Sequence, residues 1–354
     1  LARWLSCGVD PNTVDVDGGS ERVGLIDIAA CHGHAGLIDA LIAAGADVNK
    51  AMTTDGATPL LIAAETGHLA VVTKLIAAGA DNKAHSNDGA TPLYVAVWKG
   101  HLTMVTKLIA AGALVDKAVI DGRTPLWMAA QGGHFTAVME LIAAGADVDK
   151  TRTIIRGPGG RLQQNGCTSL YIAAQNGHLT VVTKLIAAGA DVNKAVSDGR
   201  TPLWMAAQEG HLTVVTKLIA AGALVDKALT TNGATPLYIA AQNGHLTVVT
   251  KLITAGADVN KARTTDGCTP LSIAAEKGHL TVVTELIAAS ADVDKAMTDG
   301  GWTPLQTAAQ WGHTAVVSKL LQHGADKSIR GWENRTPLES AQRNHHAAIV
   351  ALLV

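Results

Sequence analysis

The sequence predicts an all-α solenoid of stacked helical repeats, and its period is the main evidence. Successive repeat starts are separated by 34, 33, 33, 44, 33, 34, 34, 34 and 33 residues. A period of 33–34 residues held across 354 residues indicates a stacked array, with one enlarged unit at the interval of 44. The starts comprise a degenerate copy at Gly24, an altered copy at Thr168, and Thr-Pro-Leu at Thr58, Thr91, Thr124, Thr201, Thr235, Thr269, Thr303 and Thr336.

Composition agrees with this fold class. Hydrophobic residues make up 48% of the chain, but aromatic residues only 3%. The core is therefore expected to be aliphatic and alanine-rich, with small residues that let helices pack closely. The hydrophobic content is too high for a disordered chain.

Residues 53–84 illustrate why each unit should form two short helices. Thr58 is predicted to cap the first helix, and Pro59 to occupy its first position, where no N–H is needed. Gly67 can take the left-handed conformation that ends this helix, and His68 opens a second helix with an apolar stripe. Two-turn helices do not persist alone, so stacking between units must stabilise them.

Three motifs recur through the chain: Thr-Pro-Leu, Ala-Ala-x-x-Gly-His and Gly-Ala-Asp-Val-Asn, as in Thr235–Leu237, Ala240–His245 and Gly256–Asn260. By these motifs, residues 24–354 resemble the ankyrin repeat family. The resemblance implies helix-turn-helix repeats joined by β-hairpin loops, called fingers here, with fingers and first helices lining a concave face. Residues 1–22 are interpreted as the tail of a truncated N-terminal repeat plus its finger. Residues 23–354 form about ten repeats, with an enlarged finger at 151–166.

One departure from the family is consistent along the array. The family usually has His directly after Thr-Pro-Leu, whereas this chain has other residues. Two interpretations remain open: the rings among them pack between neighbouring first helices, or they form a stacking row that faces a ligand. The residues are Leu61, Tyr94, Trp127, Tyr171, Trp204, Tyr238, Ser272, Gln306 and Glu339.

The sequence predicts no catalytic site, metal site or cofactor. Ten of the fourteen His residues recur once per repeat, so they are too far apart to share a metal ion and are expected to be structural. No nucleophile-elbow, zinc-protease or phosphate-loop motif occurs. Cys167 and Cys268 occupy equivalent positions three repeats apart and cannot form a disulfide. We therefore expect the chain not to be an enzyme.

Charge and hydropathy narrow the class of partner. A net charge of −2 argues against general nucleic-acid binding, and no apolar run is long enough for a membrane span. The chain starts at Leu1 without a visible secretion signal, and four Cys residues do not make a disulfide scaffold. These features favour a cytoplasmic, reducing compartment, with an N-terminal part missing.

Lysines that recur along the second helices are either a solvated face or a site for an anionic partner.

Candidate partner-binding residues are those that break the repeat. The enlarged finger carries Arg152, Arg156 and Arg161 without an acidic residue, and is either a gripping element or a tolerated insertion. The family resemblance also places the residues before Thr-Pro-Leu and before Gly-His on the concave face. Trp and Arg are enriched among interface hot spots. This second set is Trp98, Lys99, Arg123, Arg200, Trp302, Trp311, Trp332 and Arg335.

The function implied by the resemblance is a non-catalytic scaffold or adaptor that binds proteins on its concave face. A rigid, preformed surface loses little entropy on binding. Two alternatives remain. The array is a structural subunit or spacer of a large assembly, which its near-identical repeats favour, or it is the recognition domain of a longer enzyme or channel.

Overall fold

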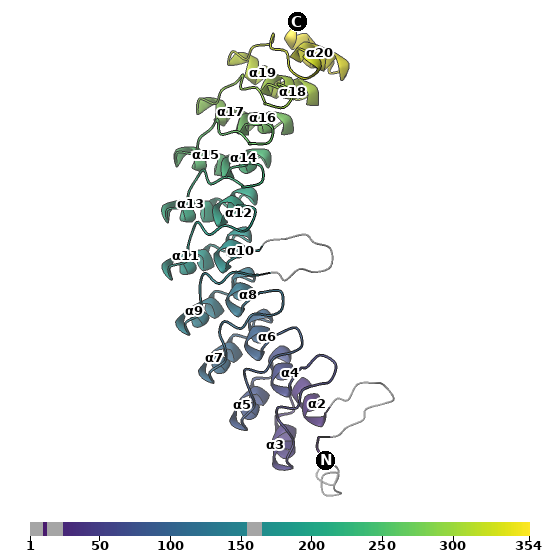
Figure 1. Ribbon diagram of the computed structural model, residues 1–354, viewed down its shortest axis with the longest axis vertical. Helices are drawn as coiled ribbons and strands as arrows, with labels where there is room; N and C mark the ends of the chain where they lie inside the picture. Colours follow the sequence, from purple (N-terminus) through teal and green to yellow (C-terminus); the bar gives the residue numbers. More distant parts are fainter. Residues whose placement is uncertain (1–9, 13–23, 154–164) are drawn as a thin grey trace. The chain divides into compact units, whose positions relative to one another are not determined.

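The computed structural model describes residues 10–12, 24–153 and 165–354 (Figure 1). The chain divides into two compact units. The first comprises Leu1–Ile172 with Ala187–Ala190, and the second comprises Ala173–Ile186 with Asp191–Val354. In the described ranges, each unit contains paired helices and no sheet.

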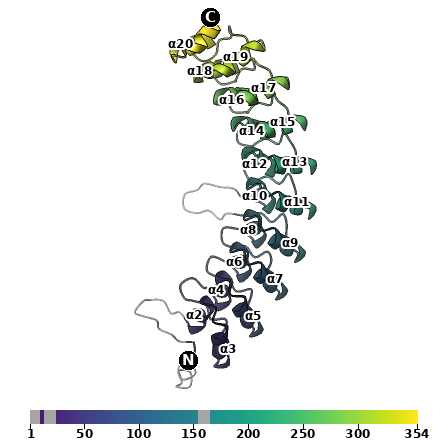
Figure 2. The ribbon, with the colours of Figure 1, turned by 180° about the vertical axis from the view of Figure 1, so that it is seen from behind.

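In the first unit, the first helices of successive repeats pack side by side as α2, α4, α6 and α8, and the second helices as α3, α5, α7 and α9 (Figures 1 and 2). The bounds are α2 (Leu25–Cys31), α3 (Ala35–Ala43), α4 (Pro59–Thr66), α5 (Leu69–Ala77), α6 (Pro92–Trp98), α7 (Leu102–Ala110), α8 (Pro125–Gln131) and α9 (Phe135–Ala143). The next helix, α10 (Ser169–Gln175), contains the boundary between the two units.

The second unit repeats this arrangement, with α12, α14, α16, α18 and α20 as one row and α13, α15, α17, α19 and α21 as the other. The bounds are α11 (Leu179–Ala187), α12 (Pro202–Gln208), α13 (Leu212–Ala220), α14 (Pro236–Gln242), α15 (Leu246–Thr254), α16 (Pro270–Lys277), α17 (Leu280–Ala288), α18 (Pro304–Trp311), α19 (Thr314–Gln322), η1 (Trp332–Asn334), α20 (Pro337–Arg343) and α21 (Ala347–Leu353).

The local signals in the sequence form the predicted caps. The Thr58 hydroxyl accepts a hydrogen bond from the Leu61 N–H at 3.3 Å, and Pro59 is the first residue of α4. Gly67 ends α4 in the left-handed conformation, with φ of 87°. His68 is the N-cap of α5. These positions confirm the two-helix unit inferred from residues 53–84.

The repeated histidines couple neighbouring repeats. The Nε2–H of His245 donates to the Gln208 carbonyl oxygen at 2.9 Å, and that of His279 donates to the Gln242 carbonyl oxygen at 3.0 Å. His68, His101, His211, His313 and His346 make the same contact to a carbonyl of the preceding repeat. These rings are thus held in structural hydrogen bonds.

A second series of hydrogen bonds links the loops that follow the second helices. The Asn49 side-chain oxygen accepts from the Asp81 N–H at 2.7 Å. Asp81 in turn accepts from the Lys83 N–H at 2.9 Å, which fixes its own loop. The same contact recurs in the second unit, where Asn260 accepts from the Asp292 N–H at 2.9 Å. Each loop therefore satisfies a backbone donor of the next.

The aromatic row after Thr-Pro-Leu belongs to the core, and the ligand-facing interpretation is wrong. Its rings are all buried, with Tyr171 at 0% exposure and Trp204 at 6%. The polar ends of the rings contact the finger of the following repeat. Trp204 Nε1 donates to the Ala234 carbonyl oxygen at 3.3 Å, and Tyr238 Oη lies 3.7 Å from Cys268 Sγ.

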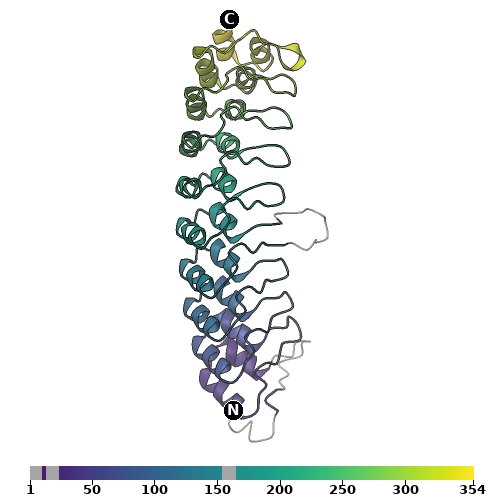
Figure 3. The ribbon, with the colours of Figure 1, turned by 60° about the vertical axis from the view of Figure 1, so that its left-hand side comes forward.

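The fingers of each unit project from the side of its first helices (Figure 3). They are hairpin-shaped loops held by a few backbone hydrogen bonds. In one of them the Val119 N–H donates to the Arg123 carbonyl at 3.0 Å and the Gly122 N–H donates to the Val119 carbonyl at 2.8 Å. Within the described ranges, pairing of the β type is limited to an isolated bridge between Arg152 and Cys167. The fingers are too short for a ladder of hydrogen bonds.

Candidate functional site

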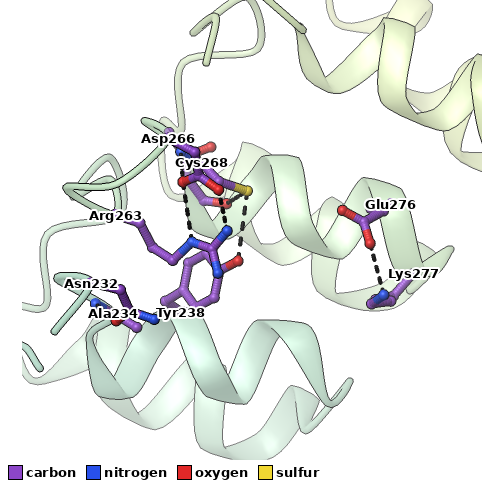
Figure 4. A network of polar contacts seen from close by, with 9 residues as sticks. Asn232, Ala234, Tyr238, Arg263, Asp266, Cys268, Glu276 and Lys277 are labelled. Atoms are coloured by element: carbon purple, nitrogen blue, oxygen red, sulfur yellow. Dashed lines mark hydrogen bonds and ion pairs between the residues drawn. The ribbon is translucent and has the colours of Figure 1, made fainter. Parts of the chain in front are cut away.

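A finger in the second unit shows how this chain neutralises charge on its finger side (Figure 4). Arg263 Nε donates to Asp266 Oδ1 at 3.1 Å, and the guanidinium carbon lies 5.1 Å from the centre of the Tyr238 ring. Partial burial raises the pKa of Asp266, but hydrogen bonds from Arg263 and Cys268 outweigh it and hold this pKa below its ordinary value. The arginine is therefore bound internally, between a carboxylate and a ring.

Arg123 and Arg152 form a similar cluster in the first unit. Arg123 Nε donates to Asp121 Oδ1 at 3.0 Å, and Arg152 Nη2 donates to Asp121 Oδ2 at 3.2 Å. Their guanidinium carbons lie 6.0 and 5.4 Å from the centre of the buried Trp127 ring. Partial burial raises the pKa of Asp121, but both arginines, and chiefly Arg123, lower it below its usual value. These two candidate binding residues thus already have internal partners.

Arg200 repeats the arrangement in the second unit. Its Nε donates to Asp198 Oδ2 at 2.8 Å, and its guanidinium carbon lies 6.0 Å from the centre of the Trp204 ring. In both of these fingers, the arginine directly before Thr-Pro-Leu therefore neutralises the aspartate two residues earlier.

Trp98 and Lys99 lie at the end of α6 and contact each other. Trp98 is 53% exposed, and Lys99 Nζ is 4.4 Å from the ring centre. Lys99 also pairs with Glu65 Oε1 of the preceding repeat at 3.1 Å. An exposed indole beside polar side chains is typical of an interface anchor.

A groove lies beside Trp98 in the first unit. It has a volume of about 460 Å³ and lies between the fingers at 52–57 and 86–90, against α4 and α6. A smaller cavity of about 130 Å³ continues it toward Tyr94 and Arg123. Trp98, Asp88 and Ala90 line both hollows. The groove is wide enough for side chains of a bound segment.

In the second unit, Trp311 is 60% exposed at the end of α18. Trp302 is half-buried, and its carbonyl closes its finger by accepting from the Met297 N–H at 2.8 Å. Arg335 forms an ion pair with Glu333, which also binds Arg343 at 2.7 Å. Trp311 is therefore the most accessible of these predicted anchors.

Three predicted residues fall partly or wholly outside the described structure. Arg156 and Arg161 of the enlarged finger lie outside the described residues. Trp332 begins the short helix η1, but its side chain is outside the described part. Whether the enlarged finger binds a partner therefore stays a prediction.

Sequence reasoning missed the groove and one residue beside it. Ala57 and Ala90 line the groove at positions where two other fingers carry Arg123 and Arg200. Ile120 is 61% exposed on the finger next to Asp88, at a position that is polar in other repeats. The available signal was the absence of an arginine and the presence of one isoleucine.

Within the ranges that the structure describes, no three His, Cys, Asp or Glu side chains are grouped so as to hold a metal ion. No helix there combines the length and the apolar character required to cross a membrane. Cys167 and Cys268 are buried, and burial raises the pKa of the Cys268 thiol to about 11.

Comparisons with known proteins agree with this architecture. A family model for ankyrin repeats in three copies matches residues 26–118, 111–196, 170–263 and 271–354. The crystal structure of the human ASB11 ankyrin repeat domain is 27% identical, with a TM-score of 0.56, and the match covers 65% of this chain and 97% of that one. No curated protein matches the chain. Ankyrin repeats are in general protein-interaction modules and are typically non-catalytic. The chain belongs to the ankyrin repeat family.

Proposed function

We propose that the chain is a non-catalytic scaffold or adaptor that binds proteins on the finger side of its repeats, the side that the family resemblance describes as concave. The observation that carries this proposal is Trp98, which is 53% exposed at the edge of a groove of about 460 Å³. Burying such an indole at an interface contributes a large share of binding energy. Trp311, which is 60% exposed and lies one position later in its repeat than Trp98, is the anchor of the second unit.

The architecture favours binding with little rearrangement. Threonine N-caps fix the first helices that carry Trp98 and Trp311, and a buried side chain after Thr-Pro-Leu, Tyr94 in α6 and Gln306 in α18, anchors each of them in the core. A surface fixed in this way loses little conformational entropy when a partner binds. Arg123, Arg152 and Arg200 are held by aspartates of their own or neighbouring fingers, so they contribute shape and hydrogen-bond donors more than free charge.

The test is a selection of binding peptides from a random peptide library on the whole chain, followed by affinity measurements with three variants. Trp98→Ala and Trp311→Ala are each expected to weaken the peptides that use their unit at least about tenfold, as for an interface hot spot. Trp204→Phe, a change at a buried ring, is the control and should leave binding intact. A chain that enriches no peptide above background contradicts the proposal.

A structural subunit or spacer is the second candidate function. Leu170–Ala195 and Leu237–Ala262 differ only at Ala187 against Thr254, which favours regular geometry over distinct contacts. Lysines recur on the second helices, away from the fingers, as in Lys217 of α13 and Lys251 of α15. This function would be favoured by a partner whose affinity is unchanged by Trp98→Ala and Trp311→Ala but falls steeply as the salt concentration rises.

A further inference from the structure

The residue before Thr-Pro-Leu differs between fingers in a way that changes their charge. Two fingers have the sequence Asp-Gly-Arg, at residues 121–123 and 198–200. In each, the arginine pairs with the aspartate of the same finger, and the shortest nitrogen–oxygen distance is 2.7 Å. Asp55-Gly56-Ala57 and Asp88-Gly89-Ala90 have the same pattern with alanine in place of arginine. Two neighbouring fingers thus keep the acidic residue and lack its cation.

The two fingers that lack an arginine both border the groove of the first unit. Asp55, Ala57, Asp88 and Ala90 all line it. Asp55 and Asp88 accept hydrogen bonds from the backbone of their own turns, at 2.9 Å from the Ala57 N–H and 3.2 Å from the Ala90 N–H. Within the described residues, neither forms an ion pair. The groove therefore holds two carboxylates without an ion pair of their own. Asp88 also accepts a hydrogen bond from the Ser86 hydroxyl, and its charge acts on Arg123, which lines the adjoining cavity but is paired with Asp121.

Two apolar departures from the repeat flank the same place. Trp98 lines the groove where the equivalent residues of most other repeats are polar. Ile120 donates its N–H to the Asp88 carbonyl at 2.8 Å, at a position where other fingers have a polar residue. The residues equivalent to Trp98 are Cys31, Glu65, Gln131, Gln175, Gln208, Gln242, Glu276, Gln310 and Arg343. Those equivalent to Ile120 include Asn87, Thr230, Thr264 and Thr298.

We propose that this groove binds an extended segment of a partner protein by an arginine side chain with an apolar neighbour. The guanidinium would pair with Asp55 and Asp88 and take the place that Arg123 and Arg200 fill in their own fingers. The apolar neighbour would pack against Trp98 and Ile120. The remaining lining charge, Glu65, is already paired with Lys99, so the groove's net attraction is for a cation. This inference rests on the proposed function and names the partner of one of its sites.

The experiment compares peptides selected from the library on the whole chain, measured by fluorescence anisotropy. Selected peptides should share an arginine next to an apolar residue, and replacing that arginine by citrulline, which is neutral and similar in shape, should weaken binding about tenfold or more. The double variant Asp55→Asn and Asp88→Asn should weaken binding by a similar factor. Both changes keep the size of the side chain, and the asparagine oxygen can still accept the hydrogen bond from the backbone N–H of the turn.

Ala90→Arg is the sharper variant because it gives this finger the sequence found at Arg123 and Arg200. Its arginine should occupy the groove and abolish binding of the arginine peptides. Ala234→Arg, the same change at the equivalent position of the second unit, is the matched control and should leave binding unchanged. Circular dichroism of both variants should match that of the wild type.

Two results would overturn the inference. Selected peptides without a basic residue would do so, as would arginine peptides whose binding survives both Ala90→Arg and the paired Asn changes. If such peptides still depend on Trp98 or Trp311, the proposed function stands and only the arginine groove is refuted. If no peptide is enriched, both proposals fail.

Discussion

Asp27 is a buried carboxylate in the first turn of α2, and replacing it with asparagine is expected to stabilise the first unit above pH 6. The side chain is 4% exposed. Its Oδ2 accepts from the Gly24 N–H at 2.9 Å, whereas its Oδ1 has no hydrogen-bond partner within the described residues. Burial raises the pKa of Asp27 from 3.8 to about 6, against the opposing effect of the Gly24 hydrogen bond.

The sign and size of the effect follow from this raised pKa. A folded state that binds a proton more tightly than the unfolded state is favoured at low pH. The Asp27 contribution is therefore fully present below pH 3.8 and is lost as the pH rises through about 6. Raising the pKa from 3.8 to about 6 corresponds to at most about 3 kcal/mol of unfolding free energy, and solvent screening lowers this figure. Asparagine keeps the acceptor for Gly24 and carries no charge.

The assay is urea unfolding at several pH values from 4 to 8, followed by circular dichroism, with amide hydrogen exchange in α2 to locate the change. Asp27→Asn should be close to neutral at pH 4 and stabilising by about 1–3 kcal/mol at pH 8. Asp39→Asn, at an exposed position on α3, is the control and should change stability by less than about 1 kcal/mol. A difference between Asp27→Asn and wild type that does not vary with pH would refute the reasoning.

Three further predictions concern the packing between repeats. Gly244 and Gly256 both have positive φ, but a Cβ at Gly244 would lie 2.8 Å from the His279 ring, whereas one at Gly256 meets nothing within 4 Å. Gly244→Ala should therefore cost at least about 1 kcal/mol more than Gly256→Ala in urea unfolding, and equal costs would contradict the contact. Trp204→Phe should lower the free energy of unfolding by about 1–3 kcal/mol because it removes the hydrogen bond to the Ala234 carbonyl. Trp311→Phe, at an exposed ring, should leave it almost unchanged. Thermal unfolding measures both effects, and equal losses would contradict the prediction. In a Cys7→Ser, Cys31→Ser variant, the buried Cys167 and Cys268 should react with a thiol reagent at pH 8 at least about 100-fold more slowly than in denaturant, and fast labelling in the folded state would show that the thiols are accessible.

The repeat unit could be predicted from the sequence because its signals are local. Thr58, Pro59 and Gly67 each act on the backbone within one turn, so their roles are visible without any neighbouring repeat. The sequence alone does not decide whether the aromatic row lies in the core or faces a ligand. Whether Tyr94 or Trp204 faces the core depends on the finger of the next repeat, and that finger buries both rings.

The candidate site was predicted only in part, for a related reason. Trp98 and Trp311 were identified because an exposed indole departs visibly from the repeat. Arg123 and Arg200 also depart from it, but their aspartate partners two residues earlier hold them within the finger. The groove is lined by the small residues Ala57 and Ala90 of two neighbouring fingers. Small residues leave such a space only where the fold places the two fingers side by side, and the sequence does not show this.

The histidine contacts separate stability from recognition within each repeat. His101 bonds to the carbonyl of Glu65, His245 to that of Gln208, and His313 to that of Glu276, so the acceptor is always a main-chain atom. Trp98 occupies the position equivalent to these acceptor residues. Because the histidine contact uses only the main chain there, exchanging that side chain leaves the histidine contact in place. New binding specificities can therefore arise at this position by single substitutions that keep this contact between repeats.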